Sequence, residues 1–202
     1  MADGKVSLVT LTIKTVIVHT VTYSLVGFLA FTVLDYGRLF AEPPLKVVMC
    51  QTDDPWVMAG PLFQPVRGLL FALAFYPLRD VLFGRKGGWL VLWLELVILG
   101  ILSPFGASPG SVEGMIYTIW PVWSHVIGLP EVLLQSFLLS VVLCYWVRHP
   151  EQKWLSWTLG SLLFLVLLLT MLNTFGVSAG IRFVVTGLVI IGVIIAAGGQ
   201  KG

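Results

Sequence analysis

The chain has 202 residues, of which 57% are hydrophobic and only 11% are charged, and its mean hydropathy is +0.96. A soluble domain usually carries about a quarter charged residues, so this composition excludes one and indicates a polytopic membrane protein. Twelve basic and 10 acidic residues leave a formal net charge of +2, which gives no basis for a nucleic-acid partner.

Six apolar runs, separated by charged or Pro/Gly-rich connections, divide the chain. Lipid offers the backbone no hydrogen bonds, so such runs are helical, and about 20 residues are needed to cross about 30 Å of hydrocarbon. The sequence therefore predicts an all-α fold, a single transmembrane domain over residues 1–202 that forms a polytopic helical bundle of about six spans. The predicted spans cover approximately 11–34, 58–78, 88–103, 131–147, 154–175 and 181–198.

The first predicted span contains two ionisable residues. Lys14 lies near its start, where a lysine side chain can extend along apolar surface to the aqueous boundary, so we expect the ammonium group to reach the cytoplasmic boundary. His19 lies deeper, and an ionisable residue inside a membrane is a functional hypothesis by default.

The second predicted span contains the interrupted stretch PLFQPVRGLL, residues 61–70. Gln64 and Arg67 are three residues apart and share a helix face, while Pro65 removes a hydrogen-bond donor between them. We expect a kink at Pro65 that turns Gln64 and Arg67 towards the bundle interior. Interrupted helices of this kind often line cavities.

Depth estimates suggest a partner for Arg67. It lies roughly 14 Å from the outer face, and Glu95 in the third span lies roughly 10 Å from the inner face, so their heights differ by about 6 Å. The short turn between these two spans predicts that they are antiparallel neighbours. We therefore expect an ion pair between Arg67 and Glu95, with His19 at a height where it can join the same centre.

Three roles are open for this intramembrane polar centre of His19, Gln64, Arg67 and Glu95. The charged pair can simply fix the register of the helices. Arg67 can bind an anionic head group or solute. His19 and Glu95 can form a proton relay, because histidine and buried carboxyl groups can titrate in a working pH range.

The connection 104–130 is the longest in the chain and looks organised. Ser111 is a suitable N-cap for a helix whose first turn carries Glu113. Three aromatic residues that prefer the lipid–water boundary follow, Tyr117, Trp120 and Trp123. These features predict a short interfacial or partly re-entrant helix near 111–127.

A second polar cluster is expected at the outer face, where Glu113, His125 and Glu131 can meet and Gln135 lies one turn after Glu131. We expect this cluster to dock the 104–130 connection onto the bundle. A histidine with two carboxylates can also bind a divalent metal, but the spacing matches no metal motif, so no metal site is predicted. The sequence identifies no catalytic residue and no cofactor.

The distribution of basic residues orients the predicted bundle, because cytoplasmic connections retain the excess of positive charge. One side has eight, Lys5, Lys14, Arg79, Arg85, Lys86, Arg148, Lys153 and Lys201; the other has three, Arg38, Lys46 and Arg182. This count places both termini in the cytoplasm.

The strings GPLFQPVRGLLFAL (60–73), FYPLRDVLFGRKGGW (75–89), PGSVEGMIYT (109–118) and GLPEVLLQ (128–135) are similar to those of uncharacterised bacterial multi-pass, about six-helix, integral membrane proteins. The resemblance covers the middle half of the chain and carries no activity over to it. It implies the bacterial inner (cytoplasmic) membrane as the location.

The enzyme signatures HExxH, the P-loop and GxGxxG do not occur. The stretch GASPG at 106–110 matches GxSxG, but its proline and flanking glycines predict a turn in a loop rather than a nucleophile elbow. The first functional hypothesis is therefore a non-enzymatic membrane protein that binds or passes a small solute, ion or lipid through the intramembrane polar centre, as in transport. An accessory or structural subunit of a larger membrane complex, with protein partners besides membrane lipids, is the alternative. A membrane-embedded lipid-modifying enzyme that uses Glu113, His125 and Glu131 is the third reading.

Overall fold

The computed structural model describes residues 6–198, with side chains described through Gly187, and these residues contain helices and no β-strand. The all-α prediction is confirmed. The longer elements are α1 (Leu8–Val33), α5 (Gly60–Phe75), α7 (Gly88–Val97) with its π-helical continuation η1 (Ile98–Leu102), α10 (Leu129–Arg148), α11 (Lys153–Phe175) and α12 (Val177–Gly198). Short helices connect them: α2 (Tyr36–Ala41), α3 (Leu45–Val48), α4 (Pro55–Met58), α6 (Arg79–Leu82), α8 (Val112–Tyr117) and α9 (Val122–Val126).

Three helical segments are long and apolar enough to cross a membrane, namely α1, Val122–Arg148, which comprises α9 and α10, and α11. The count of six spans is not supported on this criterion. Helix α5 has 16 residues, which is about 24 Å of helix. Helix α7 has 10 residues, and η1 adds 5. Glycine and proline set these limits, because α5 starts at Gly60 and Pro61 and is followed by Pro77, and η1 is followed by Pro104.

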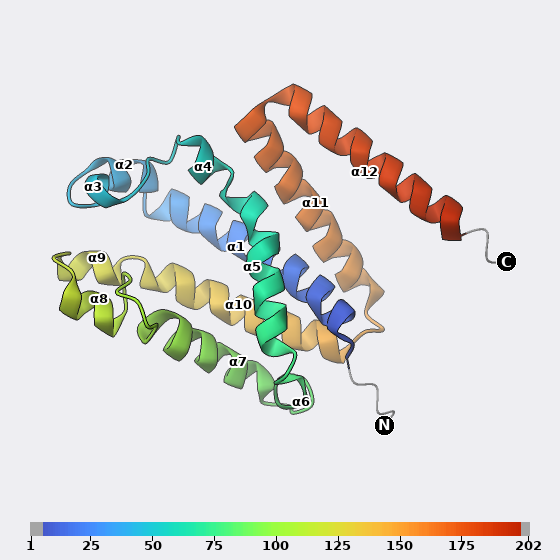
Figure 1. Ribbon diagram of the computed structural model, residues 1–202, viewed down its shortest axis with the longest axis horizontal. Coiled ribbons are helices and arrows are strands. Elements are labelled where there is room, and N and C mark those ends of the chain that lie inside the picture. The colour runs from blue at the N-terminus through green and yellow to red at the C-terminus, as the bar shows by residue number, and fades with distance from the viewer. Residues whose placement is uncertain (1–5, 199–202) are drawn as a thin grey trace.

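Helix α1 is the centre of the bundle (Figure 1). It packs against α5, α10 and α11, while α12 packs on α11. Helix α7 packs chiefly on α10 rather than on α5, its predecessor in the chain. The Phe137 ring of α10 contacts two α7 indoles edge-on, with centroids 6.0 Å from Trp89 and 5.6 Å from Trp93. The expectation that the second and third spans are packed neighbours is therefore wrong.

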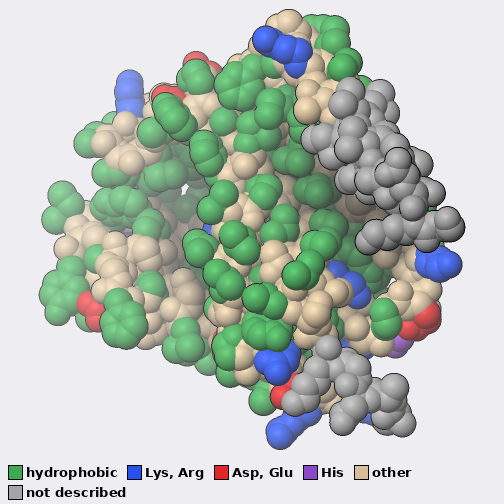
Figure 2. Space-filling model, turned by 45° about the vertical axis from the view of Figure 1, so that its right-hand side comes forward, with side chains coloured by type: hydrophobic (Ala, Val, Ile, Leu, Met, Phe, Trp, Pro, Cys, Tyr) green, Lys and Arg blue, Asp and Glu red, His purple; other side chains and the backbone are tan. Residues whose placement is uncertain are grey.

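Successive long segments run in alternating directions in Figure 1, from the start of α1 through α5, α7, α10 and α11 to α12. The start of α1, α6 and the connection between α10 and α11 lie at one end of the bundle. Helices α2, α3, α4, α8 and α9 lie towards the other. In Figure 2, apolar side chains cover most of the visible face and most charged side chains lie near its upper and lower margins, as expected of a membrane protein.

The crossing of α1 and α5 is unusually close at one point. A Cβ atom added to Gly68 would lie 2.8 Å from the Cα atom of Val16, so only glycine allows the two backbones this approach. Gln64 and Phe71 flank this crossing by about one turn on either side, and both face α1 residues. The glycine thus fixes the separation across which the polar side chains of the two helices meet.

The end of the bundle near α6 is held by basic side chains bound to backbone carbonyls. Arg148 of α10 donates to the carbonyl oxygens of Phe83, Lys86 and Leu82 at 3.1, 3.1 and 3.3 Å. Lys14 donates to the carbonyl oxygen of Trp146 at 2.7 Å and is only 9% exposed. The expectation that Lys14 reaches the aqueous boundary is wrong, because a carbonyl at the end of α10 offers its ammonium group a partner inside the protein.

Candidate functional site

His19 and Gln64 form the buried part of the intramembrane polar centre. The His19 side chain is 0% exposed, and its Nε2 lies 3.1 Å from Oε1 of Gln64. The Gln64 amide nitrogen donates to the carbonyl oxygen of Gly60 at 3.2 Å, which turns the amide oxygen towards the imidazole. The hydrogen bond therefore assigns the proton of the neutral ring to Nε2 and the lone pair to Nδ1.

The Nδ1 atom of His19 is buried and has no hydrogen-bond partner. One turn earlier in α1, the Thr15 hydroxyl is also buried and also lacks a partner. Buried polar atoms in this state are rare, because each costs about 1–3 kcal/mol when it is left unsatisfied. The centre of α1 thus holds hydrogen-bonding capacity that the protein itself does not use.

Arg67 adjoins this buried pair through a shared aromatic ring. Its guanidinium carbon lies 5.4 Å from the ring centroid of Phe71, and the imidazole of His19 meets the same ring edge-on with centroids 4.9 Å apart. The Arg67 side chain is exposed on the outside of the bundle, whereas Gln64 is buried. The expected inward orientation therefore holds for Gln64 and not for Arg67. Helix α5 continues through Pro65 to Phe75, so this proline does not end the helix.

The expected ion pair between Arg67 and Glu95 does not form. The ion pairs that the structure describes are Arg38 with Glu42, at 3.1 Å, and Arg79 with Asp80, at 4.0 Å. Glu95 lies across a gap from α5, because α7 packs on α10. The depth estimate placed the two charges at compatible heights but carried no information about lateral distance.

A cavity of about 320 Å³ occupies this gap between α5 and the α7–η1 segment. Apolar residues make up its wall except for Glu95, and the lining residues are Phe71, Ala74, Phe75, Leu78, Glu95, Leu96, Leu99 and Gly100. Arg67, Phe71 and Ala74 follow a spacing of four and three residues, which places them on one face of α5, and Leu78 lies in the turn after this helix. Arg67 therefore stands on the same helix face as the α5 wall of the cavity, one turn beyond Phe71.

The outer-face cluster is divided in the structure. His125 is 2% exposed; the Gly110 N–H donates to its Nδ1 at 3.3 Å, and its Nε2 lies 3.4 Å from the Thr118 hydroxyl oxygen. Ser111 caps α8 by accepting from the Gly114 N–H at 2.9 Å, which confirms that prediction. The predicted helix at 111–127 is instead the two short helices α8 and α9, since the chain between them is extended and leads into Pro121.

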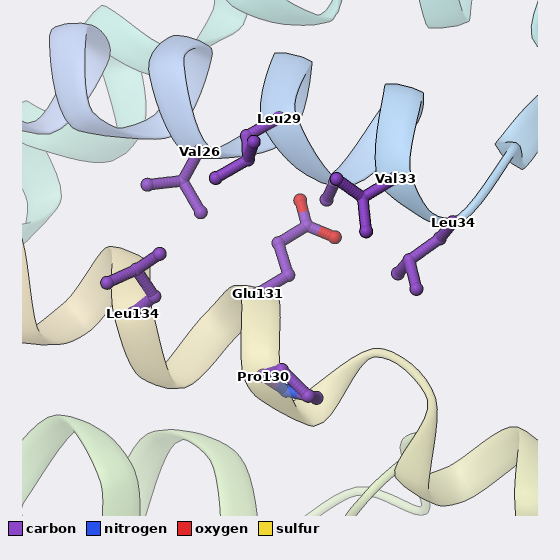
Figure 3. Close-up of a pocket in the computed structure, with 8 residues that line it drawn as sticks. Val26, Leu29, Val33, Leu34, Pro130, Glu131 and Leu134 are labelled. Carbon is purple, nitrogen blue, oxygen red and sulfur yellow. The ribbon is translucent and has the colours of Figure 1, made fainter.

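Glu131 lies apart from His125, in a groove of about 180 Å³ between α1 and α10 (Figure 3). Its carboxylate points towards α1 and accepts a hydrogen bond from the hydroxyl of Tyr36. Burial and this carboxylate raise the pKa of Tyr36 above its ordinary value. No sequence pattern connects Tyr36 with Glu131, since 95 residues separate them.

The remaining predicted residues, Glu113 on α8 and Gln135 on α10, are partly buried and lie in different helices. Among the residues that the structure describes, no three His, Cys, Asp or Glu side chains come together as metal ligands. The outer-face residues therefore serve two separate contacts, one within the 104–130 connection and one between α2 and α10.

The fold and these sites define a helical membrane protein with a polar centre between α1 and α5. No protein-family model, curated protein or solved structure matches the chain.

Proposed function

We propose that this protein is a non-enzymatic membrane protein that binds an amphiphilic ligand with an anionic head at Arg67. The observation that carries the proposal is the environment of the guanidinium group. Arg67 is exposed on an apolar helix, its described contact is the Phe71 ring, and within the part of the chain that the structure describes no carboxylate forms an ion pair with it. A cation at membrane depth is costly unless an anion or water accompanies it, so Arg67 suits an anion brought by a ligand.

The proposal depends on a topology in which α5 crosses the membrane. We infer six crossing segments, with α5, α7–η1 and α12 added to the three long ones. The alternating directions in Figure 1 support this inference, and a bilayer can thin locally around a helix of about 24 Å. Arg67 then lies about 10 Å along α5 from Gly60, within the hydrocarbon region. The excess of basic residues at the α6 end favours cytoplasmic termini, and the sequence resemblance favours a bacterial inner membrane.

The apolar cavity supplies the second half of the proposed site. It starts at Phe71, the residue whose ring Arg67 contacts, and continues along α5 to the turn at Leu78. An alkyl chain whose head is bound at Arg67 can lie in this cavity and bury apolar surface at about 25 cal/mol per Å². Ligands that carry both an anionic head and an alkyl chain are therefore favoured over a small anion alone.

Direct binding tests the proposal. We suggest radiolabelled dodecyl sulfonate added to the protein in phosphatidylcholine nanodiscs, with the signal of empty nanodiscs subtracted. Dodecanol, which lacks the charge, and methanesulfonate, which lacks the chain, are the two competitors. We expect unlabelled dodecyl sulfonate to displace the probe at concentrations at which neither competitor does.

Two variants locate the site. Arg67→Gln removes the charge and is expected to weaken binding about 10-fold or more, since a hydrogen bond to a charged group contributes about 1.5–3 kcal/mol. Arg182→Gln is the matched control, because Arg182 is also exposed on an apolar helix and donates to a carbonyl of its own helix. Equal binding by the Arg67→Gln protein and the unmodified protein would overturn the proposal.

The alternative of an accessory subunit is favoured by one observation. Helix α12 packs on α11 and lies at the margin of the bundle (Figure 1), with Ile181 and Val185 exposed. Such a helix can pack on a partner protein in the membrane. Purification in a mild detergent tests this alternative, since a stable second protein in constant ratio supports it and a monodisperse single species counts against it.

A further inference from the structure

We infer from the geometry that His19 takes up one proton when an anionic head group binds at Arg67. This inference rests on the proposed function and assigns it a regulation, namely proton-coupled binding. A hydronium ion of the bulk solvent supplies the proton: one of its O–H bonds breaks to leave water, and an N–H bond forms at Nδ1 of His19. The ligand and the proton then occupy the centre together, and each increases the affinity for the other.

The two basic groups are close enough to influence each other. Both contact Phe71, His19 at 4.9 Å between ring centroids and Arg67 at 5.4 Å from its guanidinium carbon to the ring centroid. An imidazolium ion at the buried His19 would place a second positive charge near the exposed guanidinium group of Arg67, which is unfavourable. An anion at Arg67 removes this repulsion and attracts the imidazolium ion.

Only one atom of His19 is free to receive the proton. Nε2 already carries a hydrogen, because it donates to Gln64 Oε1. Nδ1 has an unused lone pair and no partner. The Thr15 hydroxyl oxygen, one turn away on the same helix face and also without a partner, is available to accept from the newly formed Nδ1–H.

Apart from Arg67, one titratable group, Tyr23, lies beside His19, and the other charged or titratable groups on the elements around it are engaged elsewhere or distant. On α1, Tyr23 has its ring centroid 6.3 Å away and Lys14 is bound to the Trp146 carbonyl. On α10, Glu131 accepts from Tyr36, Cys144 donates to the Leu82 carbonyl, and Arg148 is bound near α6. Lys153 is exposed at the start of α11, and on α5 the charged group is Arg67, whose charge acts on His19.

The experiment measures dodecyl sulfonate binding in phosphatidylcholine nanodiscs between pH 5 and pH 8. The sulfonate group does not titrate in this range, so any pH dependence belongs to the protein. We expect the affinity to rise as the pH falls, with a limiting slope of about 10-fold per pH unit for one linked proton. In weak buffer with an indicator dye, binding to the unmodified protein should take up protons, to a maximum of about one per ligand.

Variants assign the proton to a residue. His19→Gln keeps a donor for Gln64 and is expected to bind dodecyl sulfonate with no pH dependence and no proton uptake. His149→Gln is the control, because His149 lies at the end of α10 beside Tyr145 and should leave both signals unchanged. Proton uptake that persists in His19→Gln would overturn the assignment to His19.

The outcomes separate this inference from the proposed function. A flat pH profile without proton uptake, together with lost binding in Arg67→Gln, overturns the proton coupling and leaves the anion site intact. Unchanged binding in Arg67→Gln overturns both. The measurement of proton uptake by the unmodified protein requires no variant, so a His19→Gln protein that fails to fold does not prevent the test.

Discussion

Replacement of Gly68 by alanine tests the close crossing that positions the polar centre. The added Cβ would lie 2.8 Å from the Val16 Cα atom, and this neighbour is backbone, which cannot move without shifting a helix. Overpacking of this kind typically costs about 1–3 kcal/mol. Alanine also favours the helix over glycine by about 1 kcal/mol, which partly offsets the cost.

Gly160→Ala is the matched control, because Gly160 lies inside α11 and a Cβ atom there meets nothing within 4 Å. The helix-propensity gain is common to both variants, so their difference in unfolding free energy isolates the steric cost of about 1–3 kcal/mol. At roughly 2–4 °C per kcal/mol for a chain of this size, Gly68→Ala should unfold at least about 2 °C below Gly160→Ala.

Thermal loss of helical circular dichroism in one detergent is a suitable assay for this comparison. The Gly68→Ala protein should also bind dodecyl sulfonate more weakly, because the shift separates α5 from α1 where His19 meets Gln64. A Gly68→Ala protein as stable as Gly160→Ala would refute the argument that α5 and α1 need glycine at their crossing.

Three further predictions concern other contacts. Lys14→Met should destabilise the protein by about 1–3 kcal/mol, measured by thermal unfolding, because it leaves the buried carbonyl of Trp146 without its donor. In an alkaline titration followed at 295 nm, the difference between the unmodified protein and Tyr36→Phe should reveal a tyrosine that ionises above the ordinary pKa, because burial and Glu131 raise the pKa of Tyr36. Because the pKa of Tyr36 is higher in the folded protein than in the unfolded chain, protonated Tyr36 contributes to the free energy of unfolding. This contribution is complete below about pH 10, where tyrosine in the unfolded chain ionises, and is lost as the pH rises through the pKa of the folded protein. His125→Ala should increase chymotrypsin cleavage within 104–130 severalfold, since it removes the hydrogen bonds that hold this connection, and an unchanged cleavage rate would contradict that role.

The sequence was sufficient for the fold class and for most helix positions, because an apolar run in a membrane protein has few structural options. The N-cap at Ser111 was also predictable, since capping depends on residues three positions apart. The depth of His19 and the helix face that Gln64 shares with Arg67 predict that both belong to one centre, and the structure brings the two side chains together.

Lateral neighbours were not predictable in the same way. A short connection between α5 and α7 suggested that they pack together, but the large aromatic side chains of α7 pack on α10, and Glu95 moves away from Arg67 with its helix. Lys14 binds a carbonyl 132 residues away, and Tyr36 binds a carboxylate 95 residues away. Such partners depend on which helices pack together, which depth and hydropathy do not specify.

The most direct test of the proposed site is the binding of dodecyl sulfonate to the unmodified, Arg67→Gln and Arg182→Gln proteins in phosphatidylcholine nanodiscs. The proposal predicts saturable binding that weakens about 10-fold or more in Arg67→Gln and is unchanged in Arg182→Gln. Equal binding by all three proteins, or no saturable binding by the unmodified protein, would contradict it.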